Sequence, residues 1–247
     1  MKAASELKTK IFADGADLHG ILEMYKNPVV KGFTTNPTLM RKAGIDNYEA
    51  FAKTVLNTVT DRPISFEVFS DDFFEMKQQA LKIASWGKNV YVKIPVSNTK
   101  GFPSYGLIKE LANLGVKQNV TALMTLEQVH HVTSALAEGP DACVSVFAGR
   151  IADTGRDPIP LMSAAMELLR PYPQLELIWA SPRELLNVVQ ANQIGCHIIT
   201  VTNDLLKKLN TLNKDLLEFS LDTVQMFYRD AQAAGFRLDV DLKAMVG

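Results

Sequence analysis

The 247-residue sequence has few of the residues that would mark a disulfide-bonded protein or a metalloprotein. It contains only two cysteines, Cys143 and Cys196. Both lie in apolar segments, so we expect buried, reduced thiols and no disulfide. Its four histidines show no metal-ligand spacing beside cysteines or carboxylates, so we expect no metal ion. The histidines are His19, His130, His131 and His197.

Long apolar runs and an excess of charge are also missing. The sequence has no run of roughly 18 apolar residues, the length needed to cross a membrane. The start "MKAASELKTKIF" lacks the apolar stretch of a signal peptide. The net charge of −1 gives no basic surface for nucleic acid or for an anionic membrane. We therefore expect a cytoplasmic protein that binds neither nucleic acid nor a membrane.

What the sequence does contain is an alternation of two patterns. Segments of helical periodicity, such as 48–59, 74–87, 107–115, 161–172 and 184–195, separate short runs that are rich in β-forming residues. These runs cover residues 10–15, 29–35, 63–69, 89–95, 117–124, 141–149, 175–181 and 197–202. Near-continuous apolar strands of this kind belong to a parallel sheet whose faces are covered by helices.

The number of strand and helix units predicts the fold. About eight units in roughly 250 residues is the size of a single (β/α)8 TIM barrel. We expect one domain over residues 1–247, with the barrel core at about 10–205 and a C-terminal helix and short tail at about 211–247. An open doubly wound sheet competes, but no G-x-G-x-x-G motif follows the first strand. The tail could pack across the barrel or onto a neighbouring subunit, and we expect a homo-oligomer.

The strand "VYVKIPV" contains an unexpected lysine, Lys93. An ammonium group buried among apolar side chains is costly without a partner, and lysine is almost never fully buried without a purpose. A neutral lysine is a nucleophile. The alternative is that the side chain of Lys93 reaches the barrel rim and solvent.

Other polar residues fall at or after the C-terminal ends of the predicted strands, where barrel enzymes carry their chemistry. Each one alone is compatible with a turn or a helix cap. Their recurrence after seven successive strands favours a common site. In chain order they are Asp14; Thr34, Thr35 and Asn36; Glu67; Lys93; Asn119 and Thr121; Ser145 and Arg150; Ser181 and Arg183.

The segment "SPRE", residues 181–184, supports two interpretations. Ser181 as N-cap, Pro182 at the first helical position and Glu184 three residues after the cap form a capping box. The same helix start, with Arg183 beside it, would bind a phosphate-sized anion.

Six motifs in order resemble the transaldolase family, including its fructose-6-phosphate aldolase-like branch. They are "FADGAD", "GFTTNPTL", "VYVKIPVSNTKG", "NVTALMTLEQ", "SVFAGRIAD" and "ASPRE". The resemblance covers nearly the whole predicted barrel. It implies a metal-free and cofactor-free class I aldol mechanism on sugar phosphates.

The resemblance also implies a role for each site residue. Lys93 would form a Schiff base with the ketose, and Asp14 would take the proton of the C4 hydroxyl. Glu67 would move protons through a water near Thr121. The substrate would be bound by Asn36, Asn119 and Ser145 at the dihydroxyacetone end, and by Arg150, Ser181 and Arg183 at the terminal anion.

The fate of the three-carbon intermediate separates a transaldolase from an aldolase. The aldolase branch tends to carry Gln and Tyr where this chain has Glu67 and Phe147. We therefore favour transfer of dihydroxyacetone over its release. Val146 and Pro182 depart from the family pattern beside the anion site, so a terminal group other than phosphate, such as a sulfonate, is a further alternative.

Three functions of other classes are alternatives. A different lysine-dependent barrel enzyme, such as a decarboxylase or a deoxyribose-phosphate-type aldolase, would also form a Schiff base. A non-catalytic sugar-phosphate-binding barrel would not need Asp14, Glu67 and Lys93 together. A barrel that uses a flavin or a nucleotide is disfavoured because no Gly-rich phosphate loop is present.

Overall fold

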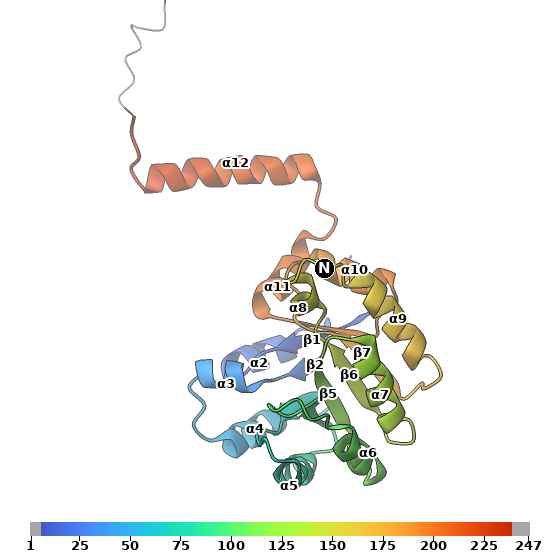
Figure 1. The fold of residues 1–247 in the computed structure, drawn as a ribbon. Coiled ribbons are helices and arrows are strands. Elements are labelled where there is room, and N and C mark those ends of the chain that lie inside the picture. Colours follow the sequence, from blue (N-terminus) through green and yellow to red (C-terminus); the bar gives the residue numbers. More distant parts are fainter. Residues whose placement is uncertain (1–5, 239–247) are drawn as a thin grey trace, which may run out of the picture. The chain divides into compact units, whose positions relative to one another are not determined.

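The computed structural model of the chain describes residues 6–238. Eight parallel strands pair in chain order, and β8 pairs with β1, so that the sheet closes into a barrel (Figure 1). This confirms the predicted (β/α)8 barrel. The strands are β1 (Lys10–Asp14), β2 (Val30–Thr34), β3 (Ile64–Glu67), β4 (Val90–Pro95), β5 (Gln118–Leu123), β6 (Ala142–Val146), β7 (Leu175–Trp179) and β8 (Ile198–Val201).

Helices connect successive strands and cover the outside of the barrel (Figure 1). The outer faces of the strands are apolar because they pack against these helices. The helices are α2 (Leu18–Tyr25), α3 (Pro37–Lys42), α4 (Tyr48–Leu56), α5 (Phe73–Ala84), α6 (Tyr105–Asn113), α7 (Leu126–Leu136), α8 (Ala148–Ala152), α9 (Ile159–Leu169), α10 (Leu186–Gln193) and α11 (Asn203–Lys208), followed by the 3-10 helix η1 (Leu209–Thr211).

The barrel interior is packed below the site. Phe12, Cys143, Ile178, Ala180 and Ile198 form one buried cluster inside the barrel. Gly32 on β2 leaves room for one of these side chains, because a Cβ atom there would lie 2.5 Å from the Phe12 ring. This apolar cluster therefore fills the barrel interior beneath the polar residues at the C-terminal ends of the strands.

Both cysteines are buried and unpaired, as expected. Burial raises the pKa of the Cys196 thiol to about 12 and raises the pKa of Cys143 as well. These thiols therefore remain protonated at neutral pH and act as small apolar side chains.

The chain divides into two compact units, Met1–Asn210 and Thr211–Gly247. The second contains α12 (Leu216–Ala233), which starts at the N-cap Asp215 and agrees with the predicted final helix. The end of the predicted tail lies outside the described residues. The prediction of one domain over the whole chain stays a prediction. Among residues 6–238, no helix has both the length and the apolar composition needed to cross a membrane.

Candidate active site

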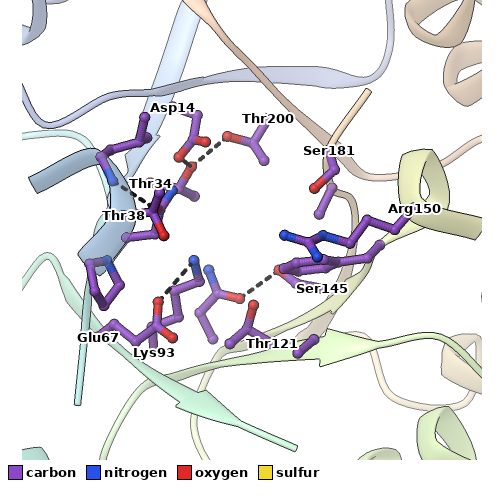
Figure 2. A pocket seen from close by; sticks show the side chains of 17 residues that line it. Asp14, Thr34, Thr38, Glu67, Lys93, Thr121, Ser145, Arg150, Ser181 and Thr200 are labelled. Atoms are coloured by element: carbon purple, nitrogen blue, oxygen red, sulfur yellow. Dashed lines mark hydrogen bonds and ion pairs between the residues drawn. The ribbon is translucent and has the colours of Figure 1, made fainter. Parts of the chain in front are cut away.

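A cavity of about 460 Å³ opens at the C-terminal ends of the strands. Figure 2 shows three groups of side chains around it: Lys93 with Glu67, Asp14 with Thr34 and Thr200, and Arg150 near Ser181. Of the residues given a catalytic or binding role from the sequence, all except Arg183 line the cavity; Thr35, also expected near the site, does not line it. The residues with such a role that line it are Asp14, Asn36, Glu67, Lys93, Asn119, Thr121, Ser145, Phe147, Arg150 and Ser181. The C-terminal ends of all eight strands surround one opening of the barrel, so residues distant in the sequence meet there.

Lys93 is buried in β4, with only 7% of its surface exposed. Its Nζ atom lies 3.3 Å from Oε2 of Glu67 and donates a hydrogen bond to the Thr35 carbonyl at 3.2 Å. Glu67 and Lys93 are direct partners in the β3–β4 register. The alternative that Lys93 reaches the solvent at the rim is therefore wrong. The lysine has the partner that its strand sequence did not reveal.

Asp14 ends β1 and is held by a pair of threonines. Thr34 Oγ1 donates to Oδ1 of Asp14 at 2.8 Å, and Thr200 Oγ1 lies 2.6 Å from Thr34 Oγ1. Burial raises the pKa of the Asp14 carboxyl, while the positive charge of Lys93 and the hydrogen bond from Thr34 lower it. Burial is the largest of these effects, so the pKa lies above its usual value. A carboxylate with a raised pKa is a stronger base.

A buried hydrogen-bond network joins β3, β5 and β6 beside the cavity. Ser145 Oγ donates to Oδ1 of Asn119 at 2.7 Å, and Nδ2 of Asn119 donates to Ser65 Oγ at 2.9 Å. Asn119 has no exposed surface, and its amide orientation is set by these two partners. These hydrogen bonds therefore hold the Ser145 hydroxyl and the Asn119 amide in fixed orientations at the cavity.

Thr121 has a buried hydroxyl with no hydrogen-bond partner among the described residues. It lies on β5, where the register shifts between Val120 and Leu123 and Ala122 takes a positive φ of 68°. Such a bulge bends a strand and redirects its side chains. Thr121 and Ala122 consequently both line the cavity.

Arg150 and Ser181 come to the same rim because α8 packs directly on the turn after β7. A Cβ atom at Gly149 would lie 1.5 Å from the Ser181 carbonyl oxygen, so only glycine allows this approach. The Arg150 guanidinium lies over the Phe147 ring, 5.6 Å from its centroid. We expected β structure as far as Gly149. The strand ends at Val146 because the chain turns at Phe147 to begin α8.

The predicted capping box at Ser181 is wrong. Ser181 has a positive φ of 56°, and the helix begins only at Leu186. Oδ1 of Asn187 accepts hydrogen bonds from the backbone N–H groups of Arg183 and Glu184 instead, at 2.7 and 3.2 Å. These N–H groups are therefore already satisfied and do not form the anion site that the motif suggested.

Arg183 lies outside the lining of the cavity and makes an ion pair with Asp153. Its Nε atom donates to Oδ1 at 3.1 Å, and Nη2 contacts Oδ2. Both side chains are about half exposed. The role of Arg183 in substrate binding stays a prediction.

Several lining residues were given no role from the sequence, although Thr34 was expected near the site as one of the polar residues at the strand ends. Thr200 could have been found, because it lies near the end of the eighth strand as its counterparts lie in the other seven. Others carry no chemical signal of their own. The additional lining residues are Thr34, Pro37, Thr38, Leu39, Ala122, Ala180 and Thr200.

The sequence profile of the transaldolase/fructose-6-phosphate aldolase family matches residues 11–246. The chain belongs to this family. It is 35% identical over 201 residues to a probable transaldolase of Dehalococcoides mccartyi, covering 81% of this chain and 89% of that protein. A probable transaldolase of Streptococcus equi subsp. zooepidemicus is 36% identical over the same shares of the two chains.

Solved structures support the barrel fold at much lower sequence identity. A putative phosphonomutase from Burkholderia cenocepacia aligns with a TM-score of 0.56 and 11% identity, over 85% of this chain and 95% of that one. A putative dihydrodipicolinate synthase family protein from Coccidioides immitis aligns with a TM-score of 0.55 and 10% identity, over 78% and 67% of the two chains. At such identities the likeness shows the fold alone. The transaldolase family assignment rests on the sequence comparisons.

Proposed function

We propose that this member of the transaldolase family transfers a dihydroxyacetone unit from a ketose phosphate of the fructose 6-phosphate type to an aldose phosphate. The observation that carries the proposal is the buried Lys93, whose Nζ lies 3.3 Å from Glu67 in a cavity that Asp14 also lines. A nucleophilic amine between two carboxyl groups is suited to Schiff-base chemistry. The similarity to probable transaldolases supports the same reaction class.

In the first half of the reaction, the neutral amine of Lys93 attacks C2 of the ketose. The resulting carbinolamine loses its hydroxyl as water and becomes a protonated Schiff base. Glu67 supplies the proton for the departing water and takes one back when the Schiff base is hydrolysed. The unpaired hydroxyl of Thr121 could hold the water molecule through which these protons pass.

In the second half, Asp14 takes the proton from the C4 hydroxyl of the Schiff base. The C3–C4 bond breaks, its electron pair moves toward the iminium nitrogen, and an aldehyde leaves. The three-carbon enamine stays on Lys93 until a second aldose accepts it by the reverse steps. The raised pKa of Asp14 favours this proton transfer.

The remaining lining residues suit the two ends of the substrate. Asn119 and Ser145, already fixed by their hydrogen bonds, would bind the hydroxyl groups of the dihydroxyacetone unit together with Asn36. Arg150 and Ser181, which follow β6 and β7, would bind the terminal anion. Binding at this distant group would align C2 with Lys93.

The carboxylate of Glu67 and the phenyl ring of Phe147 favour transfer over release. A phenyl ring has no hydroxyl with which to position a water that protonates the enamine. Release of free dihydroxyacetone, as by a fructose-6-phosphate aldolase-like enzyme, is the second candidate. A ketose with another terminal anion, such as a sulfonate, is the third, since Val146 and Pro182 depart from the family pattern beside that end.

The requirement for an acceptor tests the proposal. With fructose 6-phosphate alone, we expect slow net cleavage because the enamine persists on Lys93. Addition of erythrose 4-phosphate should raise production of glyceraldehyde 3-phosphate at least about tenfold, or roughly 1.4 kcal/mol in effective barrier. Phe147→Tyr should shift the products toward free dihydroxyacetone. Equally fast release without an acceptor in the unchanged protein would replace transfer by the aldolase function.

The anion site is tested by two arginines in different environments. Arg150→Ala should raise the KM for phosphorylated substrates about 30-fold, since a charge-assisted hydrogen bond contributes roughly 2 kcal/mol. It should change the KM for unphosphorylated dihydroxyacetone little. Arg183→Ala should act in the same direction only if Arg183 leaves Asp153 to reach the substrate. The matched control is Arg156→Ala, which removes an exposed arginine bonded to Thr154. Equal losses for both substrates would indicate a folding role.

We also propose that the protein is a homo-oligomer. Apolar side chains at helical spacing on α12, including Leu217, Leu221, Val224 and Phe227, are each more than half exposed. Within the second unit, no described residue buries them. Light scattering should give a mass that is a multiple of 27.3 kDa. A monomer at micromolar concentration would exclude this part of the proposal.

A further inference from the structure

β3, the strand that carries Glu67, is no longer paired with β2 at the position of Glu67. β2 and β3 are in register only at Phe33 with Ile64 and at Thr34 with Ser65. Thr35 then donates to the Ser65 carbonyl from both its N–H group and its hydroxyl, at 3.2 and 2.8 Å. After Thr35 the chain turns away into α3. The pairing between β2 and β3 therefore ends before Glu67.

The hydroxyl of Tyr48 takes the place of the missing strand. It accepts a hydrogen bond from the Glu67 N–H group at 2.8 Å and donates one to the Glu67 carbonyl at 2.8 Å. Burial raises the pKa of the Tyr48 phenol, so the group stays neutral and can both donate and accept at neutral pH. One side chain thus satisfies both backbone groups of a single residue.

Tyr48 is itself held firmly. It is the first residue of α4, whose N-cap Asn47 accepts a hydrogen bond from Ala50 N–H. Its ring packs against the rings of Phe69 and Trp86, with centroid distances of 5.6 and 5.9 Å. The packed ring fixes the direction in which the hydroxyl points.

The other side of Glu67 is fixed by β4. Glu67 pairs with Lys93 in the register, and the following residue, Val68, donates its N–H to the Lys93 carbonyl at 3.1 Å. The backbone of Glu67 is therefore held between the strand of Lys93 and the hydroxyl of Tyr48. Loss of the Tyr48 contact would leave that backbone attached on one side only.

We propose that Tyr48 is a positioning residue, which acts through the backbone of Glu67 to hold the Glu67 carboxylate where it exchanges protons with the carbinolamine on Lys93. Tyr48 is absent from the lining of the cavity and would not touch the substrate. The inference rests on the Schiff-base function proposed above. It adds to that function a residue from outside the cavity, on the helix that precedes β3.

Tyr48→Phe keeps the ring and removes only the hydroxyl. We expect kcat for acceptor-dependent transfer to fall about tenfold, because a small displacement of a proton-transfer group slows the reaction steeply. The KM for fructose 6-phosphate should stay within about twofold, because no binding residue is changed. The single-turnover rate of borohydride trapping should fall with kcat. The matched control is Tyr25→Phe, which removes the surface hydroxyl bonded to Asp61 and should leave both rates unchanged.

A double-mutant cycle separates positioning from a general loss of stability. If Tyr48 acts through Glu67, Tyr48→Phe should cost almost nothing in a Glu67→Gln background, where the carboxylate is already absent. Trapping rates in the four proteins, measured well below their melting temperatures, give the coupling. Equal losses in both backgrounds, or a lowered melting temperature with unchanged trapping, would overturn the proposal.

Three further outcomes are distinguishable. If Tyr48→Phe does not fold, Trp86→Phe loosens the same ring and should give a loss of kcat that disappears in the Glu67→Gln background; additivity there would overturn the proposal. If the unchanged protein traps no ketose at all, the Schiff-base function fails and the inference fails with it. Normal trapping by the unchanged protein with no effect of either variant overturns the inference alone.

Discussion

Lys93→Ala should abolish both turnover and covalent trapping of the substrate. Among residues 6–238, Lys93 is the only lysine that lines the cavity, so removal of this nucleophile should lower kcat at least about 10⁴-fold. Incubation of the unchanged protein with fructose 6-phosphate and borohydride should add the mass of the reduced adduct to one peptide. Mass spectrometry of the digested protein should locate that mass on Lys93.

The control for this experiment is an exposed lysine. Lys109→Ala, on the solvent side of α6, should leave both turnover and trapping unchanged. Label on any other lysine, or normal turnover by Lys93→Ala, would remove the basis of the proposed mechanism. Loss of turnover with unaltered thermal stability would show that the effect is chemical.

Asp14→Asn should separate the two halves of the reaction. The variant keeps Lys93 and Glu67, so it should still form the Schiff base and be trapped by borohydride. Cleavage should fall about 10³-fold, the usual scale for loss of a general base. Asp46→Asn, an exposed change of the same kind, is the matched control. Cleavage at a normal rate would assign the base to another residue.

The raised pKa of Asp14 also predicts the pH dependence. Asp14 must be deprotonated to act as a base, so kcat/KM should fall as the pH drops through its raised pKa, above the ordinary carboxyl value of about 4. Thr34→Val removes a hydrogen bond that lowers this pKa and should move the acid limb to still higher pH. An unchanged limb would mean that another group controls it.

The same shift has a consequence for stability. A carboxyl whose pKa is raised in the folded state stabilises the fold while protonated, and this contribution is lost as the pH rises through that pKa. Above that pKa the folded protein carries a buried carboxylate at a cost in stability, which Asp14→Asn removes. The melting temperature of the variant at neutral pH should be at least that of the unchanged protein.

The architecture and most of the site could be predicted from the sequence because their signals are local. Apolar strands that alternate with helical segments specify a parallel sheet wherever they occur, and about eight of them close a barrel. Closure then brings the strand ends together without any knowledge of side-chain contacts. This is why Asp14, Glu67, Lys93, Asn119 and Ser145 could be assigned to one site and were found around one cavity.

Local patterns failed where backbone conformation depends on the surroundings. The residues of "SPRE" match a capping box, yet Ser181 adopts a positive φ and its carbonyl packs against Gly149, so the helix starts later. The bulge that directs Thr121 into the cavity depends on the shifted register of β5 and β6. Neither feature has a signal within its own segment.

The barrel, and the residue types at the C-terminal ends of its strands, follow from the sequence alone. Only the tertiary structure decided their partners: Glu67 for Lys93, Asp153 for Arg183, and Tyr48 for the backbone of Glu67. The physical reason is the range of the interactions involved. Hydrophobic periodicity acts over a few residues and can be read along the chain. Ion pairs and hydrogen bonds act over about 3 Å between segments that only the closed barrel brings together.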